Sequence, residues 1–291
     1  MHPLLAFFLS FFYEWWDRKI TARIQKRIGP TYGPFGIFQP FYDFLKLLQK
    51  EEIEIKGTNN LLIITLLLLA ASSLLLSFVF IPSPFFFIEF KGDIVVIVFL
   101  SSFSFFLLGC VAYLIPSPFS AIGSGRILQQ IISFEIPFLL SIATVICFTE
   151  SFSFTQIHKK QVIPFILLFP IAFFVYIYSC LGKLEFAPFS IPHAETEIAG
   201  GWKVELNSRL LAIVRICKNL EHSLFCILGS ILFLGGGGFL ILLIKSFVLS
   251  SFIILLKNTT ARYRIDQALK VFWEKIIPLS LIQIIIVALL K

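Results

Sequence analysis

Long apolar runs alternate with short polar segments along most of the chain. Such runs occupy residues 61–81, 94–115, 129–149, 162–181 and 273–290. Residues 208–257 form a longer run that the sequence GGGG interrupts at 235–238, which predicts two segments, 208–234 and 239–257. Because about 20 apolar residues in a helix cross the hydrocarbon core of a bilayer, the pattern predicts seven membrane spans.

Residues 1–16 are an eighth candidate span. At a rise of 1.5 Å per residue they reach only about 24 Å, short of the roughly 30 Å hydrocarbon core. Either this helix extends into the sequence EWWDRK or it enters the bilayer incompletely. Trp15 and Trp16 suit the membrane interface. The expected fold is therefore an all-α, polytopic transmembrane bundle of about eight spans, forming one integral membrane domain over residues 1–291.

The first polar segment, residues 17–60, contains a different helical pattern. In GIFQPFYDFLKLLQK (36–50), the polar residues Gln39, Asp43, Lys46 and Lys50 recur at intervals of four, three and four. On a helix these residues share one face. We expect an amphipathic helix lying in the membrane interface, in preference to the first part of another span.

Composition supports a membrane protein and narrows its chemistry. The chain is 58% hydrophobic and only 14% charged, with 36 Phe residues and a net charge of +7. Basic residues of membrane proteins collect on cytoplasmic loops, so this charge does not imply nucleic acid as a partner. The five cysteines lie in or beside apolar runs without a CxxC pair, so we expect neither a metal nor a cofactor in this chain.

The distribution of Lys and Arg predicts the orientation in the cell membrane. With the N-terminus outside, the outward segments hold Lys91, Lys159, Lys160 and Lys291, and the inward loops hold most of the others. Loops one, three, five and seven are therefore expected to be cytoplasmic. They include 17–60, the acidic loop 182–208 and the last loop 258–272. The N-terminus has no basic region or cleavage site typical of a signal peptide.

Charged residues also occur inside the predicted spans, where they are costly. Lys218 has Glu221 and His222 at helical spacing, so local pairing is one interpretation. Lys245 lies in the next span, and Glu135 lies alone in QQIISFEIPFLLSI. A lone membrane carboxylate is typical of a proton relay, although pairing that stabilises the bundle is the alternative.

The sequence APFSIPHAETEIAGGWKVELNS concentrates acid within loop five. It holds Glu195, Glu197 and Glu205, with His193 just ahead of them. Clustered carboxylates titrate as a coupled set and can accept and pass protons. The alternative is an ordinary solvated loop.

Several of these segments, in order, resemble one known family. DRKITARIQKRIGP with GPFGIFQPFYDFLKLLQKE, ISFEIPFLL, APFSIPHAETEIAGGWKVELNSRLLA and ARYRIDQALKVFWEKIIPLSL are similar to the H-type (subunit one) membrane protein of respiratory complex I and of energy-converting membrane-bound hydrogenases. The resemblance implies a subunit that has no redox chemistry of its own. It would anchor a peripheral redox arm and couple that arm to ion translocation.

The resemblance also implies roles for particular residues. Glu135, Glu195, Glu197 and Glu205 look like members of the family's acidic proton path, and we add His193, Glu221 and Lys245 to it. The expected docking residues for the peripheral arm are Arg18, Arg23, Arg27, Asp43, Lys46, Arg262, Arg264 and Asp266. The implied partners are a hydrogenase-like large subunit, an iron–sulfur small subunit and antiporter-like membrane subunits. Iron–sulfur clusters and a NiFe centre would lie in those partners.

Departures from the family pattern favour its hydrogenase branch. Quinone-reducing members usually carry acid where this chain has Ser190, His193 and Lys218, and Arg215 is closer to the hydrogenase branch. We therefore expect a ferredoxin-linked, H₂-evolving or related complex that moves H⁺ or Na⁺. The connector GPTYGPFGIFQP instead resembles complex I, so a quinone-chamber subunit is the alternative. A stand-alone secondary transporter and a purely structural anchor are the alternatives from other classes.

Overall fold

The computed structural model describes residues 1–31, 33–51, 57–84, 88–206, 208–235 and 237–289. Regular structure in these ranges is helical throughout, which confirms the predicted all-α membrane bundle. Lys291 and part of the first loop (52–56) lie outside the described residues. Among the described residues, six helices are long and apolar enough to cross a membrane. Helix α1 (Pro3–Ile24) and the shorter α8 (Pro170–Lys183) occupy the places of the other two predicted spans.

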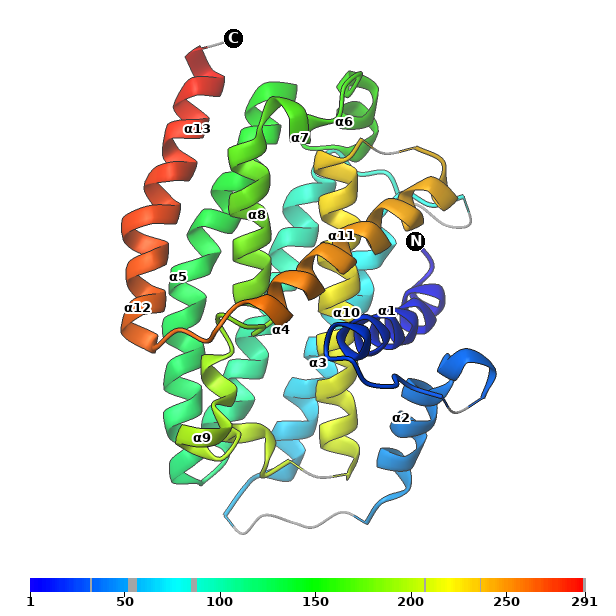
Figure 1. Ribbon diagram of the computed structural model, residues 1–291, viewed down its shortest axis with the longest axis vertical. Coiled ribbons are helices and arrows are strands. Elements are labelled where there is room, and N and C mark those ends of the chain that lie inside the picture. The colour runs from blue at the N-terminus through cyan, green and yellow to red at the C-terminus, as the bar shows by residue number, and fades with distance from the viewer. Residues whose placement is uncertain (32, 52–56, 85–87, 207, 236, 290–291) are drawn as a thin grey trace.

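Helix α1 (Pro3–Ile24) extends the N-terminal helix beyond residues 1–16. It continues through EWWDRK, as the first of the two alternatives predicts. After the short turn η1 (Pro34–Gly36), the predicted amphipathic helix is present as α2 (Gln39–Gln49). Phe41 and Phe44 of α2 pack edge-on or tilted against Phe11 of α1, whereas Phe38 and Tyr42 are exposed. Helix α2 is thus fixed to the bundle by one apolar face (Figure 1).

Helices α3 (Asn60–Val79), α4 (Asp93–Leu114) and α5 (Pro118–Thr149) follow as adjacent spans. Helix α5 has 32 residues, which is about 48 Å at the helical rise and exceeds the roughly 30 Å hydrocarbon core. It begins well before the predicted segment 129–149. One end of α5 therefore projects beyond the bilayer and offers a surface for the acidic loop, which contains the short helix α9 (Glu195–Ile198) (Figure 1).

The prediction of a single span over 162–181 is wrong. After α6 (Phe154–Lys160), the structure has two separate helices there: α7 (Phe165–Leu168) and α8 (Pro170–Lys183). Proline lacks the backbone N–H that continues a helix, and Pro170 stands at the first position of α8, where this loss is tolerated. Lys183, the last residue of α8, is only 1% exposed.

The acidic loop then runs over one end of the bundle through η2 (Ile191–His193), α9 (Glu195–Ile198) and η3 (Gly201–Lys203). Helix α10 (Ser208–Phe233) returns through the centre and is the most buried of the long helices. Helix α11 (Phe239–Thr259) crosses obliquely in front of it in Figure 1. The chain ends with α12 (Ile265–Lys270), a π-helical turn η4 (Val271–Ile276) and α13 (Ile277–Leu289), which begin earlier than the predicted segment 273–290.

Candidate functional site

Five charged or titratable side chains meet at the inner end of α8 and form what we call the buried cluster: Glu185, His193, Lys203, Lys218 and Glu221. Glu185 is at its centre, with a side chain only 3% exposed. One carboxylate oxygen, Oε2, contacts His193 Nε2 and lies 3.4 Å from Lys203 Nζ. The other, Oε1, lies 3.4 Å from Lys218 Nζ. Lys218 also lies 3.2 Å from Glu221, as the helical spacing predicts.

Local backbone geometry brings Lys203 and His193 back to Glu185. Gly200 and Gly201 have φ values of +91° and +68°, a left-handed conformation that side chains disfavour. A Cβ atom on Gly201 would lie 2.5 Å from the carbonyl oxygen of Pro192. The sequence GGWK therefore permits a tight reversal, and this reversal folds η3 against η2.

A second ion pair, between Lys183 and Glu135, joins the end of α8 to α5. Lys183 Nζ lies 3.0 Å from Glu135 Oε2, and Ser102 of α4 hydrogen-bonds the same carboxylate. The Lys183 ammonium also lies 3.9 Å from the ring centroid of Phe138, a cation–π distance.

Together these groups alternate in type from the acidic loop to Glu135, and we call this arrangement the charge row: His193, Glu185, Lys218, Glu221, Lys183 and Glu135. Alternating partners offset the large cost of placing isolated charges in a low dielectric medium. The row ends at Glu135, whose side chain is 21% exposed beside a groove between α4 and α5.

Burial and ion pairing act in opposite directions on Glu185 and His193. Burial alone raises the pKa of Glu185, but Lys218, His193 and Lys203 outweigh it and hold that pKa well below 4.5. For His193, burial lowers the pKa below 6.5, and the neighbouring Glu185 offsets only part of this effect. At neutral pH the pair is therefore a carboxylate that accepts a hydrogen bond from a neutral imidazole.

This arrangement predicts a stability that depends on pH in two windows. As pH falls below 6.5, the unfolded state protonates His193 before the folded state does, so stability decreases with falling pH. The lowered pKa of Glu185 adds a second loss below 4.5, as pH falls toward its folded value. Thermal unfolding of the purified protein between pH 4 and 8 measures both. His193→Gln should reduce the upper loss and leave the lower one, and an unchanged profile above pH 4.5 would contradict this assignment.

A second polar cluster joins α1, α2 and α10, and no part of it is in the predicted proton path. Glu14, only 9% exposed, accepts hydrogen bonds from Arg18, Arg215 and Asn219. Arg18 also lies 2.6 Å from Asp43 of α2. Arg18 and Asp43, which we predicted as docking residues, thus hold the amphipathic helix to the bundle.

The remaining predicted path residues lie apart from the charge row. Glu197 bridges Arg126 of α5 and Arg262, which follows α11, and both contacts are 2.7 Å long. The pKa of Glu197 is lowered, and the hydrogen bond from Arg126 is the largest cause. Glu195 is exposed and Glu205 is partly buried. Lys245 Nζ binds the carbonyls of Leu234 and Gly235, where it caps the end of α10.

The predicted docking residues are mostly at the surface. Arg23, Arg27 and Lys46 are exposed, and Arg264 lies 3.7 Å from the exposed Asp266. Arg262 is exposed as well, although it contacts Glu197.

Sequence reasoning missed Lys183, Glu185, Lys203 and Glu14 as site residues. The signal for Glu185 was available: LGKLEF places two charges directly after an apolar run. The signal was hidden because the prediction placed these charges in the loop after the span, whereas the structure buries both of them at the end of α8.

The described residues offer no cluster of three or more His, Cys, Asp or Glu side chains that could hold a metal ion. A cavity of about 280 Å³ lies between α2, η3 and α10, with Lys203, Arg215 and Lys218 among its lining residues. Leu47, Leu211 and Val214 supply its apolar wall. An organic molecule with an apolar body and an anionic or carbonyl end fits this lining.

Comparisons with known proteins give a consistent result. The family model described as NADH dehydrogenase matches residues 1–288. The H-type subunit of NADH-quinone oxidoreductase from two strains of Dehalococcoides mccartyi is 31% identical over 283 residues, which is 94% of this chain and 80% of each relative. A chain in the structure of the membrane-bound sulfane sulfur reductase, an archaeal respiratory membrane complex, superimposes with a TM-score of 0.89. It is 26% identical, and the match covers 98% of this chain and 96% of that one. The chain belongs to the NADH dehydrogenase family, as a membrane protein of the H type.

Proposed function

We propose that this chain is the membrane anchor and coupling subunit of a redox-driven, ion-pumping complex. The observation that carries the proposal is the charge row, which runs from His193 in the acidic loop to Glu135 in α5. Charges this deeply buried are costly, and they are typical of proton and ion pathways rather than of inert packing.

The row suggests how coupling proceeds. A change of charge in a peripheral arm near the acidic loop alters the field at Glu185, which three cationic or titratable neighbours hold ionised. Moving or protonating one member changes the free energy of its ion-pair partner, because the paired members lie within about 3–4 Å of each other. Glu195, Glu197 and Glu205 would supply protons at the water-facing end, and Glu135 would pass the change to antiporter-like membrane subunits. The translocated ion is H⁺ or Na⁺.

The proposed peripheral arm is of the hydrogenase type, linked to ferredoxin and carrying iron–sulfur clusters and a NiFe centre in its own subunits. Ser190, His193 and Lys218 support this branch, since quinone-reducing relatives usually carry acid at these positions. His193 and Lys218 both contact Glu185, so the replacements change the charge of the site itself. Arg23, Arg27, Lys46, Arg264 and Asp266 would form the docking face, on the cytoplasmic side.

A quinone-chamber role is the second candidate. The curated relatives carry the name NADH-quinone oxidoreductase, and the cavity of about 280 Å³ adjoins the buried cluster. Its apolar wall and cationic end suit a quinone ring and carbonyl.

The test is affinity purification of the native complex through a tag on this chain. The expected result is a stable assembly with a large subunit and an iron–sulfur subunit, nickel in stoichiometric amount, and H₂ evolution driven by reduced ferredoxin. Nickel-free material that reduces a quinone would replace the hydrogenase branch with the second candidate. A chain that purifies alone and transports a solute would overturn the coupling role altogether.

A further inference from the structure

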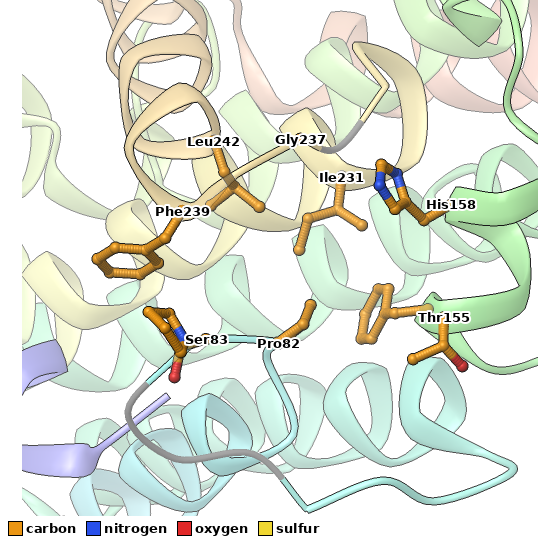
Figure 2. A pocket seen from close by; sticks show the side chains of 10 residues that line it. Pro82, Ser83, Thr155, His158, Ile231, Gly237, Phe239 and Leu242 are labelled. Carbon is orange, nitrogen blue, oxygen red and sulfur yellow. The ribbon is translucent and has the colours of Figure 1, made fainter.

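A second cavity lies at the opposite end of the bundle from α9, beside α6 (Figures 1 and 2). Its volume is about 400 Å³, within the roughly 300–1,000 Å³ range of small-molecule sites. The wall comes from separate segments: Pro82 and Ser83 after α3, Phe154 of α6, Ile231 of α10, and Phe239 and Leu242 of α11. None of these residues belongs to the charge row or to the predicted docking face.

The lining is apolar along its length and polar at one end. Figure 2 shows the side chains of Ile231, Phe239 and Leu242 on one side of the space, with His158 and Thr155 together at one edge. Thr155 donates a hydrogen bond of 2.8 Å to Glu89, so its hydroxyl has a partner. His158 is exposed, and it opens the basic sequence His158, Lys159, Lys160 at the end of α6.

Position relative to the membrane restricts what enters this cavity. The wall is built where α3 and α10 end and where α11 begins. Ends of membrane-spanning helices mark the boundary between hydrocarbon and headgroups. A ligand here therefore has an apolar part beside the spans and a polar part at the level of His158.

The charged residues at the rim of the cavity indicate which polar group the ligand carries. Lys160 is engaged with the carbonyl of Thr149, and Lys159 is exposed. One acidic residue, Glu89, lies nearby and contacts Thr155. Basic residues at the membrane surface attract anionic lipid headgroups by about 1 kcal/mol each.

We propose that this cavity binds one acyl chain of an anionic glycerophospholipid, with the headgroup phosphate beside His158 and Lys159. The bound lipid fills the space between Ile231 of α10 and Leu242 of α11. It thereby supports the junction between α10 and α11. Lys245, one turn beyond Leu242, stabilises the same junction by capping the end of α10. The inference is independent of which redox arm the complex carries.

Native mass spectrometry of the whole complex tests the site, after exchange into nanodiscs of phosphatidylglycerol or phosphatidylcholine. Ser83→Trp fills the cavity from its rim. Ser72→Trp makes the same change on the lipid-exposed face of α3, away from the cavity, and is the matched control. We expect at least a tenfold lower occupancy by phosphatidylglycerol for Ser83→Trp and native occupancy for Ser72→Trp.

A second pair of variants tests the headgroup and does not disturb packing. Lys159→Gln should lower phosphatidylglycerol occupancy about fivefold, equivalent to ~1 kcal/mol, and should not change phosphatidylcholine occupancy. Lys270→Gln changes an exposed lysine at the end of α12 and should have no effect. Equal occupancy in Ser83→Trp and Ser72→Trp would overturn the proposal. A partner helix or a phosphate-free lipid found in the cavity would overturn it equally.

Discussion

Replacing Glu135 with glutamine is expected to leave electron transfer near its native rate and to reduce ion translocation at least about fivefold. Glutamine keeps the volume and can keep the hydrogen bond from Ser102, but it removes the charge that pairs with Lys183. Coupling free energies between sites are typically about 1–3 kcal/mol, which corresponds to roughly 5–150-fold. The loss of one charged member should remove coupling of this size, because in the proposed mechanism the row passes its signal as changes of charge.

The measurement compares two quantities in proteoliposomes that contain the whole complex: the rate of electron transfer and the ion gradient formed per electron. Glu274→Gln is the matched control, since Glu274 is an exposed carboxylate on the last helix, outside the charge row. A full gradient in Glu135→Gln would refute the relay. A parallel loss of electron transfer and gradient would instead show damage to assembly.

Glu185→Gln is expected to destabilise the protein by about 3–5 kcal/mol, the typical cost of removing one partner from a buried ion pair. Glu185 is the shared counterion of Lys218 and Lys203, and it accepts from His193. Without its charge, the Lys218 ammonium is left with Glu221 as its counterion, and Lys203 loses its ion-pair partner. The expected observable is a lower midpoint of thermal unfolding for the purified complex.

Combining this change with Lys218→Met separates lost pairing from lost packing. The double variant removes the cation that Glu185→Gln leaves without enough counter-charge, so part of the lost stability should return. Glu195→Gln alters an exposed carboxylate of the same loop and should leave the midpoint unchanged. Additive effects of the two single substitutions would mean that Glu185 and Lys218 do not act as a pair.

Most of the membrane bundle could be predicted because apolar run length reports directly on helix length. The segments 61–81 and 94–115 correspond closely to α3 and α4. The predicted span 162–181 failed because hydropathy does not register the backbone effect of Pro170, which begins a new helix within an equally apolar stretch. The early start of α5 was missed because its first turns are more polar than a membrane span. These turns are helical nevertheless, and they contact other parts of the protein.

The candidate site was predictable only where its residues lie on one helix. The contact between Lys218 and Glu221 follows from their spacing, and the structure brings the two together. Glu185 meets His193, Lys203 and Lys218 only through the short α8 and the reversal at Gly200 and Gly201, which sequence spacing does not indicate. Density of acid in the sequence was a poorer guide, since Glu195 is exposed while Glu14 and Glu185 are buried.

The bridge from Glu197 to Arg126 and Arg262 has a mechanical consequence. It ties the acidic loop to α5 on one side and to the segment before α12 on the other. The same segment is attached again by Tyr263, whose backbone N–H donates to the carbonyl of Pro188 at 2.9 Å. Beyond α12, the ring of Phe272 in η4 lies 4.7 Å from that of Phe189. The loop and the start of the last helix are therefore joined at several points. We expect a protein that displaces the loop from outside the membrane to displace this helix as well.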